Sequence, residues 1–208
     1  MSRQTAIIAA AVGFFAVTQG APLQAQETQA KVSFLFNGAQ VSIDRDNNQA
    51  AQYAATFTAK DKNCGAACIA PMQVATGVAT FDEPQVLRFL VDVVANNRGL
   101  MVDARSPDDR AQGFIPGSVS LPHATLDPAQ GYWANVIAAL GAKASGAAFN
   151  FANARALLVY DTGPSSDDAG KLVKNLLAVG YPAEKIKYYR GGMQVWSVLG
   201  FNIEQGRS

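Results

Sequence analysis

Residues 156–180 decide the fold, and they read ALLVYDTGPSSDDAGKLVKNLLAVG. The first five residues are an unbroken apolar run, which is typical of a strand buried on both faces of a parallel sheet. A polar loop follows at residues 161–166. A helix is then expected from Lys171 to Val179, because the glycine at position 180 is a favoured helix terminator. The stretch therefore predicts a strand, a loop and a helix in succession.

The same alternation continues on both sides of this stretch. A helix is expected to open at Asp82 and to end at Gly99, since acidic residues and proline fill its first turn. Alternating strands and helices indicate βαβ units, and hence an α/β fold with a mostly parallel sheet that has helices on both faces. The remaining strands are expected at residues 100–102, 119–121 and 186–189, and the remaining helices at residues 133–142 and 193–199.

The first 25 residues have the pattern of a secretory signal peptide. Arg3 precedes an apolar run of 12 residues, Ala6 to Val17, which is too short to span a bilayer. Small and polar residues follow and end at Ala25, so cleavage is expected there. We therefore expect an exported, periplasmic protein whose mature chain begins at Gln26 and has no membrane segment. An anchor that is retained is the alternative.

Residues 26–76 are expected to form a small extension of the main domain. Two apolar, strand-like runs flank Asn37-Gly38, which is a strong hairpin signal because both residues tolerate a positive φ. A lone hairpin is only marginally stable, so it is expected to pack on residues 77–208. An Ala-rich polar stretch and the pair Cys64 and Cys68 follow the hairpin.

Composition excludes several classes of function. The chain has 208 residues, of which 49% are hydrophobic and 16% charged, so it is neither disordered nor a coiled coil. Lys+Arg 17 against Asp+Glu 16 gives a net charge of +1, which provides no field for nucleic acid. One histidine and two cysteines cannot supply a four-ligand zinc site by themselves. No metal and no cofactor are expected.

Three stretches, taken in order, resemble the rhodanese-like family. VDARSP at residues 102–107 and GFIPGSVSLP at residues 113–122 are similar to its strand-Asp-x-Arg element and its Gly-His-Ile-Pro-Gly-Ala turn. The apolar run and loop at residues 156–166 stand where the family keeps its active-site loop. GYP at residues 180–182 and YRGGMQVW at residues 189–196 resemble its Gly-Tyr and Gly-Gly-x-x-x-Trp ending. The resemblance implies the family's α/β fold.

The resemblance extends to exported, single-domain members of the family. These share a hairpin followed by a Cys-x3-Cys-Ile-x-Pro-Met element, which is found here at residues 64–72. Their active-site loop looks like Cys-Asn-Gly-Pro-Trp-Cys. In this chain the six loop positions are Asp161, Thr162, Gly163, Pro164, Ser165 and Ser166. Both loop cysteines are thus absent, and the histidine of the family's turn is Phe114.

The missing cysteine implies loss of the family's standard activity. The family stores a transferred sulfur as a cysteine persulfide, which the carboxylate of Asp161 cannot form. Loop N–H groups are expected to hydrogen-bond this carboxylate and keep it ionised, so that it repels thiosulfate. Asp167 and Asp168 add negative charge, and they are expected to cap the following helix.

Other residues are candidates for ligand binding or catalysis. Asp103 and Arg105 are expected to form a buried or half-buried pair beside the loop. Arg190 is the candidate cation for a bound anion or for the acidic loop itself. With Asp161 and Ser166, these residues make up the candidate ligand-binding set. Ser166 as a nucleophile would need a base, and nothing in the sequence brings the sole histidine, His123, to it. Phosphorylation of Asp161 would need Mg²⁺ ligands.

Cys64 and Cys68 leave two functions open. In an oxidising compartment they are expected to form a structural disulfide, with a redox pair, a persulfide carrier or a metal site as alternatives. The first function is that of a non-catalytic pseudoenzyme that binds an unknown periplasmic protein or a small ligand through the old active-site face. The second is that of a sulfurtransferase or thiol-redox enzyme that uses these two cysteines.

Overall fold

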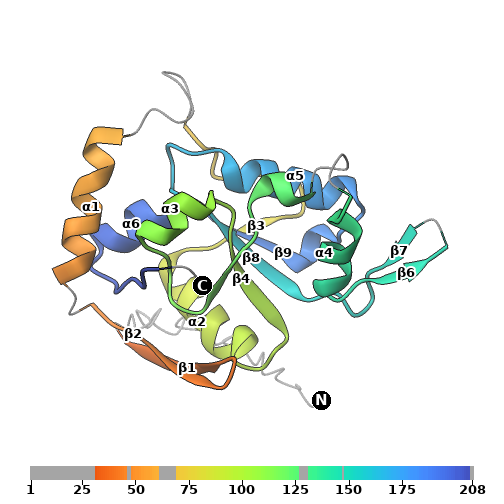
Figure 1. The fold of residues 1–208 in the computed structure, drawn as a ribbon, viewed down its shortest axis with the longest axis horizontal. Helices are drawn as coiled ribbons and strands as arrows, with labels where there is room; N and C mark the ends of the chain where they lie inside the picture. The colour runs from red at the N-terminus through yellow and green to blue at the C-terminus, as the bar shows by residue number, and fades with distance from the viewer. Residues whose placement is uncertain (1–30, 46–47, 61–68, 127–130, 147, 207–208) are drawn as a thin grey trace, which may run out of the picture.

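A five-stranded sheet forms the centre of the computed structural model, which describes residues 31–45, 48–60, 69–126, 131–146 and 148–206 (Figure 1). The strand order is β3-β9-β8-β4-β5, and every neighbouring pair is parallel. The strands are β3 (Ala79–Thr80), β4 (Gly99–Asp103), β5 (Ser118–Ser120), β8 (Ala156–Tyr160) and β9 (Ile186–Tyr189). The predicted parallel sheet is confirmed.

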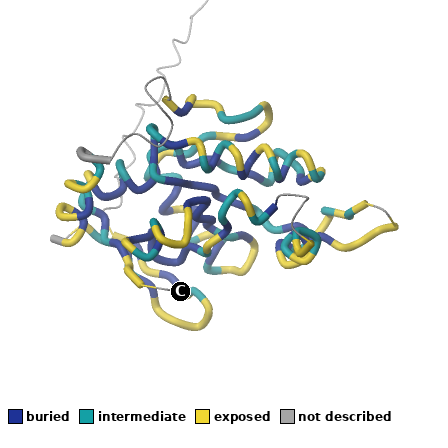
Figure 2. Tube along the Cα trace, turned by 45° about the horizontal axis from the view of Figure 1, so that its top comes forward, coloured by how far each residue is buried: buried dark blue, intermediate teal, exposed yellow. Residues whose placement is uncertain are grey.

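The apolar run of β8 lies at the middle of this sheet. Leu157 to Tyr160 are fully buried, and β8 pairs with β4 on one side and with β9 on the other. Successive side chains of a strand point to opposite faces. Leu158 and Tyr160 accordingly join one hydrophobic cluster, and Leu157 and Val159 join the other. A strand with two apolar faces must be covered on both sides, as the buried centre in Figure 2 shows.

Helices cover both faces of the sheet. The first face packs against α2 (Glu83–Phe89), η1 (Leu90–Val94) and α6 (Gly192–Val198). The second face packs against η2 (His123–Leu126), α4 (Trp133–Ala139) and α5 (Asp168–Ala178). A short η3 (Ala183–Lys185) leads into β9. These positions agree with the expected α/β layers.

The N-terminal hairpin packs on the larger domain, as its sequence predicted. β1 (Val32–Phe36) and β2 (Ala39–Ile43) are antiparallel and joined at Asn37-Gly38, whose φ values are 49° and 81°. Phe34 and Ile43 are buried in the first hydrophobic cluster. A Cβ on Gly117 would lie 2.7 Å from Cζ of Phe34, so glycine permits this close contact.

Several elements differ from the expectations. The helix that opens at Asp82 runs through α2 and the π-helical η1 and ends at Val94, whereas Gly99 begins β4. The sequence did not predict the short elements β3, η2 and η3. It also did not predict α1 (Asn48–Lys60), α3 (Pro107–Gln112) and the hairpin of β6 (Lys143–Ser145) and β7 (Ala148–Asn150). This second hairpin is mostly exposed and projects from the body (Figures 1 and 2).

Candidate functional site

The candidate site lies at the carboxyl ends of the parallel strands, where open α/β sheets bind ligands. β4 ends at Asp103, β8 runs into Asp161, and β9 runs into Arg190. The loop after β8 leads directly into α5. The topology thus brings three of the predicted site residues to the same edge of the sheet. Their side chains differ from one another in the groups that they contact.

The side chain of Asp161 is fully buried and points into its own loop. Its Oδ1 accepts the N–H of Gly163 at 2.9 Å, and its Oδ2 accepts the N–H of Ala169 at 2.9 Å. Ala169 belongs to the first turn of α5, where backbone N–H groups favour negative charge. The expected N–H donors are present, and the carboxylate fills the cradle that they form.

Burial sets the charge state of this carboxyl. Desolvation raises the pKa of Asp161 to about 6, although hydrogen bonds from Ala169, Gly163 and the Ser166 side chain act in the opposite direction. The N–H groups of the loop favour the ionised carboxylate, as expected, but burial opposes them. Asp161 is mostly ionised at neutral pH and becomes protonated in mildly acidic solution.

The start of α6 holds the loop from the other side. Met193 donates its N–H to the backbone oxygen of Asp161 at 3.0 Å, and Gln194 donates its N–H to that of Thr162 at 2.9 Å. A Cβ on Gly192, which has a φ of +54°, would lie 2.6 Å from the nitrogen of Gly163. Glycine is needed at position 192 because two backbones approach each other here, whereas a Cβ on Gly191 would lie 2.7 Å from the ring of Tyr189.

Ser166 lies beside Asp161 and is held by hydrogen bonds within the loop. Ser166 is buried, and its N–H donates to the Gly163 oxygen at 2.9 Å. His123 lies 3.7 Å from Asp168, measured from Nδ1 to Oδ1, and no sequence pattern indicates this proximity. The Ser166 side chain is hydrogen-bonded to Asp161, and its Oγ accepts the N–H of Asp168 at 3.3 Å. These contacts give the hydroxyl a structural role.

The two acids after the loop do not cap α5 as expected. Asp167 is the N-cap residue, but its side chain makes no capping hydrogen bond. It pairs with Lys171 at 2.7 Å, and both groups are about half exposed, so the pair contributes little to stability. Asp168 lies in the first turn, and partial burial raises its pKa against the opposing effect of His123. Lys171 therefore offsets part of the negative charge at this end of the loop.

Asp103 and Arg105 form a buried ion pair, with side chains 0% and 1% exposed. The guanidinium binds both carboxylate oxygens, at 2.8 and 2.6 Å, and also donates to the Gly113 oxygen at 2.7 Å. Arg110, which was not predicted as a site residue, lies 3.2 Å from the same carboxylate. Tyr160 donates its hydroxyl to Asp103 at 2.9 Å. This network joins β4, β8 and α3, and it is not open to a ligand.

Arg190 contacts the segment that precedes the main domain. Its Nε donates to the backbone oxygen of Ala70 at 2.7 Å, and the side chain lines a cavity of about 350 Å³. The N–H of Ala70 in turn donates to the oxygen of Pro164 in the loop at 2.7 Å. The segment after the Cys-x3-Cys element is thereby attached to the candidate site. Cys64 and Cys68 themselves lie outside the described residues, as does the expected signal peptide.

Neither a metal centre nor a membrane span is found in the described part of the chain. Its His, Cys, Asp and Glu side chains form no group of three or more that could hold a metal ion. Within the same residues, no helix has the length and apolar character needed to cross a membrane.

The fold and site define an α/β protein with a parallel sheet and a buried acidic loop at the carboxyl ends of its strands. The rhodanese-like domain model matches residues 90–199, which is just over half of the chain. The protein therefore belongs to the rhodanese-like domain family. No curated protein matches the chain.

Solved structures of similar fold come from several organisms. A thiosulfate sulfurtransferase from Pseudomonas aeruginosa is 21% identical, with a TM-score of 0.42, and the match covers 63% of this chain but only 21% of that one. The human single-domain sulfurtransferase TSTD1 is 20% identical, with a TM-score of 0.40 and coverage of 59% and 96%. A rhodanese-like domain from Anabaena is 16% identical, with a TM-score of 0.40 and coverage of 63% and 80%. The chain thus spans about a fifth of the Pseudomonas protein.

Proposed function

We propose that this protein is an exported, rhodanese-like pseudoenzyme that has lost thiosulfate sulfurtransferase activity. It binds a partner protein or a small ligand through the face that carries residues 161–166. One observation carries the proposal: the side chain at the end of β8 is a buried carboxylate, held by the N–H groups of Gly163 and Ala169. In sulfurtransferases of the family, the resemblance assigns this position to the nucleophilic cysteine.

The chemistry of sulfur transfer explains the loss. A cysteine thiolate attacks the outer sulfur of thiosulfate, a new S–S bond forms, and sulfite leaves with the electron pair of the broken bond. Asp161 has no sulfur that can carry the transferred atom. Because its pKa is about 6, it is also an anion at neutral pH and disfavours an anionic donor.

Exposed apolar side chains beside the loop support a binding role. Ile69 and Met72 are 77% and 65% exposed, although both are large hydrophobic residues. Met72 also lines the cavity of about 350 Å³, together with Phe81 and Arg190. The lining also includes Asp82 and Glu83 beside Arg190, so its charge does not favour an acidic ligand, and the exposed apolar side chains are the feature that supports a binding role.

Rebuilding the loop tests this assignment of Asp161. Asp161→Cys alone should give little thiosulfate:cyanide sulfurtransferase activity, because Asp167 and Asp168 still disfavour the thiolate and the donor. Adding Asp167→Gly and Asp168→Gln should raise the activity well above that of the single variant. Asp161→Ser, combined with the same two changes, is the matched control and should remain inactive.

The outcome that counts against the assignment is equally specific. If the rebuilt cysteine loop forms no persulfide with thiosulfate, although circular dichroism shows a native fold, residue 161 is not the family's sulfur-carrying position. Mass spectrometry of the thiosulfate-treated variant measures persulfide formation directly, because a persulfide adds the mass of one sulfur atom.

A second function remains open because of one contact. Ala70 lies two residues after Cys68 and is hydrogen-bonded to Pro164 in the loop. A sulfurtransferase or thiol-redox enzyme that uses Cys64 and Cys68 would therefore have its cysteines close in sequence to a segment that touches the loop. Stoichiometric labelling of both thiols in the oxidised, mature protein would favour this function, and a complete disulfide would favour the pseudoenzyme.

A further inference from the structure

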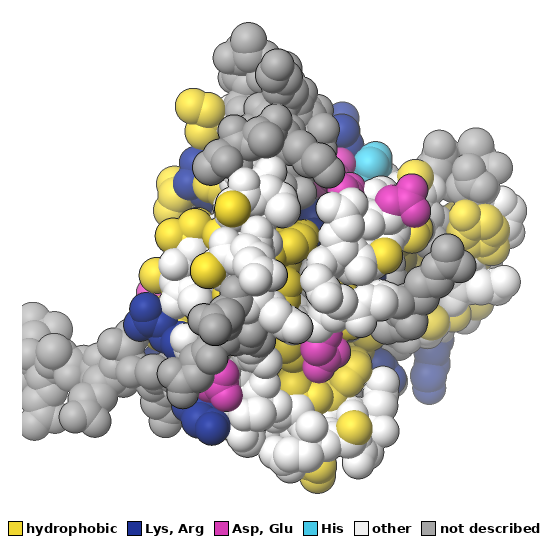
Figure 3. Space-filling model, turned by 60° about the vertical axis from the view of Figure 1, so that its left-hand side comes forward, with side chains coloured by type: hydrophobic (Ala, Val, Ile, Leu, Met, Phe, Trp, Pro, Cys, Tyr) yellow, Lys and Arg dark blue, Asp and Glu magenta, His cyan; other side chains and the backbone are white. Residues whose placement is uncertain are grey.

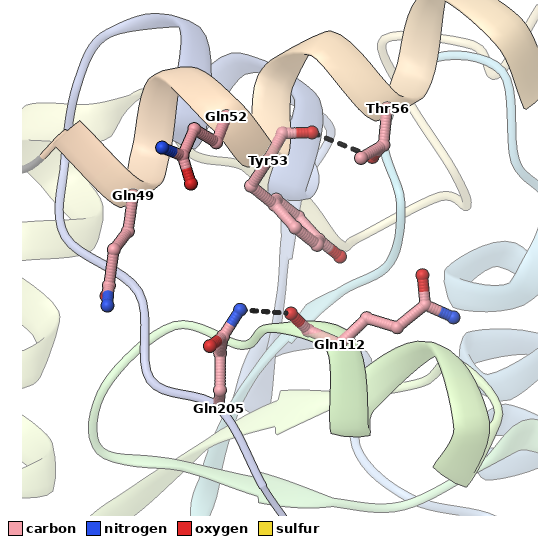
Figure 4. A pocket seen from close by; sticks show the side chains of 6 residues that line it. All are labelled: Gln49, Gln52, Tyr53, Thr56, Gln112 and Gln205. Carbon is pink, nitrogen blue, oxygen red and sulfur yellow. Dashed lines mark hydrogen bonds between the residues drawn. The ribbon is translucent and has the colours of Figure 1, made fainter.

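A second cavity, of about 380 Å³, lies away from the loop. It is bounded by α1, by the end of α3 and by the C-terminal segment (Figure 4). In that view, side chains of α1 extend toward Gln112 and Gln205 on the opposite wall. The lining residues come from three separate parts of the sequence: Gln49, Gln52, Tyr53, Thr56, Gln112 and Gln205. None of them belongs to residues 161–166.

The lining is polar and carries no charged side chain. Its glutamine amides offer both donors and acceptors, since a single amide has one acceptor oxygen and two N–H donors. The hydroxyls of Thr56 and Tyr53 already donate to the backbone oxygens of Tyr53 and Gly113. Gln49, Gln52 and Thr56 are spaced so that they share one face of α1, next to Tyr53. The face that includes α1 shows mainly uncharged side chains and backbone, with an acidic group below its centre and further charged groups toward its edges (Figure 3).

Both walls of the cavity are anchored to the core. Tyr53 is 8% exposed, its hydroxyl accepts a hydrogen bond from Arg105 at 2.9 Å, and its ring packs edge-on against Phe57 at 5.0 Å. On the opposite wall, Glu204 and the buried Phe114 exchange two backbone hydrogen bonds, at 2.8 and 3.0 Å, next to Gln205. A cavity between anchored walls requires little ordering when a ligand enters, and this favours binding.

We propose that this cavity binds a small, neutral polyhydroxyl ligand of the saccharide class. Each hydroxyl of such a ligand donates and accepts one hydrogen bond, so adjacent hydroxyls match the donor and acceptor of one glutamine amide. The volume lies within the range of small-molecule sites. A charged ligand would lose its hydration without gaining a counter-ion from the lining, and is therefore disfavoured.

Saturation-transfer NMR and calorimetry test the proposal on the mature protein. The probes are glucose, sucrose and maltose, with gluconate as the charged counterpart of glucose. Saturable binding of a neutral sugar is expected. The double variant Gln52→Ala/Gln205→Ala should weaken it by about tenfold or more, since hydrogen bonds from both walls are lost. Gln40→Ala, which removes an exposed glutamine of β2 outside the cavity, should bind as the wild type does.

Three results would overturn the proposal. The first is that none of the three neutral sugars binds. The second is that gluconate binds as tightly as glucose. The third is that the double variant keeps the wild-type affinity. Gln52 and Gln205 are both exposed, so their replacement leaves the core intact, and circular dichroism of the variant checks this.

Discussion

The buried carboxyl of Asp161 makes the stability of the fold depend on pH in a way that one substitution removes. Its pKa is about 6 in the folded protein, against an ordinary value of 3.8. Because the folded-state pKa is raised, this group's contribution to stability is fully present below the unfolded pKa and is lost as pH rises through about 6. The difference in pKa corresponds to about 3 kcal/mol over the full titration.

Replacement by asparagine removes this titration while keeping the shape of the side chain. Between about pH 4.5 and 8, the unfolding free energy of the wild type should fall relative to that of Asp161→Asn by about 2 kcal/mol, since part of the titration is already complete at the lower pH. Asparagine presents one acceptor oxygen instead of two, so the variant also loses a hydrogen bond to Gly163 or Ala169. That loss is the same at both pH values and cancels in the comparison.

Urea unfolding of the two proteins at both pH values measures the effect. Asp92→Asn is a suitable control, because it removes an exposed carboxylate. A difference between wild type and Asp161→Asn that is the same at both pH values would refute the reasoning, because it would mean that burial does not raise the pKa of this carboxyl.

Three further predictions concern the core, the N-terminus and the cysteines. Asp103→Asn should lower the free energy of unfolding in urea by about 3–5 kcal/mol, because two buried guanidinium groups lose their counter-ion. The control Asp108→Asn changes an exposed residue and should have a small effect, so equal effects of the two variants would contradict this reasoning. N-terminal sequencing of exported material should begin at Gln26, and an intact Met at the start would disprove cleavage. Alkylation without reductant should leave Cys64 and Cys68 unlabelled in mass spectrometry, and stoichiometric labelling would rule out a disulfide.

The parallel sheet could be predicted because its central strands are apolar on both faces. The strand at residues 156–160 is an unbroken hydrophobic run, and β9 also lies where its sequence placed it. The hairpin turn could be predicted as well, because Asn37-Gly38 carries the positive φ values that the pattern requires. These signals are local, so one sequence is sufficient to detect them.

Elements whose formation depends on tertiary contacts were missed or misplaced. α1 is rich in alanine and polar residues and has only a weak apolar face, so nothing in its sequence showed that Tyr53 would be buried. Gly99 looked like the end of a helix, but it begins β4, where a side chain would collide with the backbone oxygen of Ala156 at 2.5 Å. Glycine is required there for close packing rather than for a turn.

The place of the candidate site in the fold could be predicted from the sequence, but its side-chain contacts could not. The loop was located correctly, whereas the roles of Arg105, Arg110 and Arg190 depend on side-chain directions that no sequence pattern encodes. The one sequence feature that could have indicated the role of Arg110 is its position, because it is a second arginine close in sequence to the acid Asp103 at the end of a strand. The contact between His123 and Asp168 joins residues far apart in the chain and had no signal at all.

The central claim is that the position at the end of β8 cannot carry sulfur, and a thiosulfate:cyanide assay of the purified, mature wild-type protein tests it most directly. Thiocyanate formation should not exceed the background measured without protein, because Asp161 offers a buried carboxylate and no thiolate. The Cys64→Ser/Cys68→Ser variant should give the same background. Turnover by the wild type that this double variant loses would contradict the account and assign the chemistry to the two cysteines.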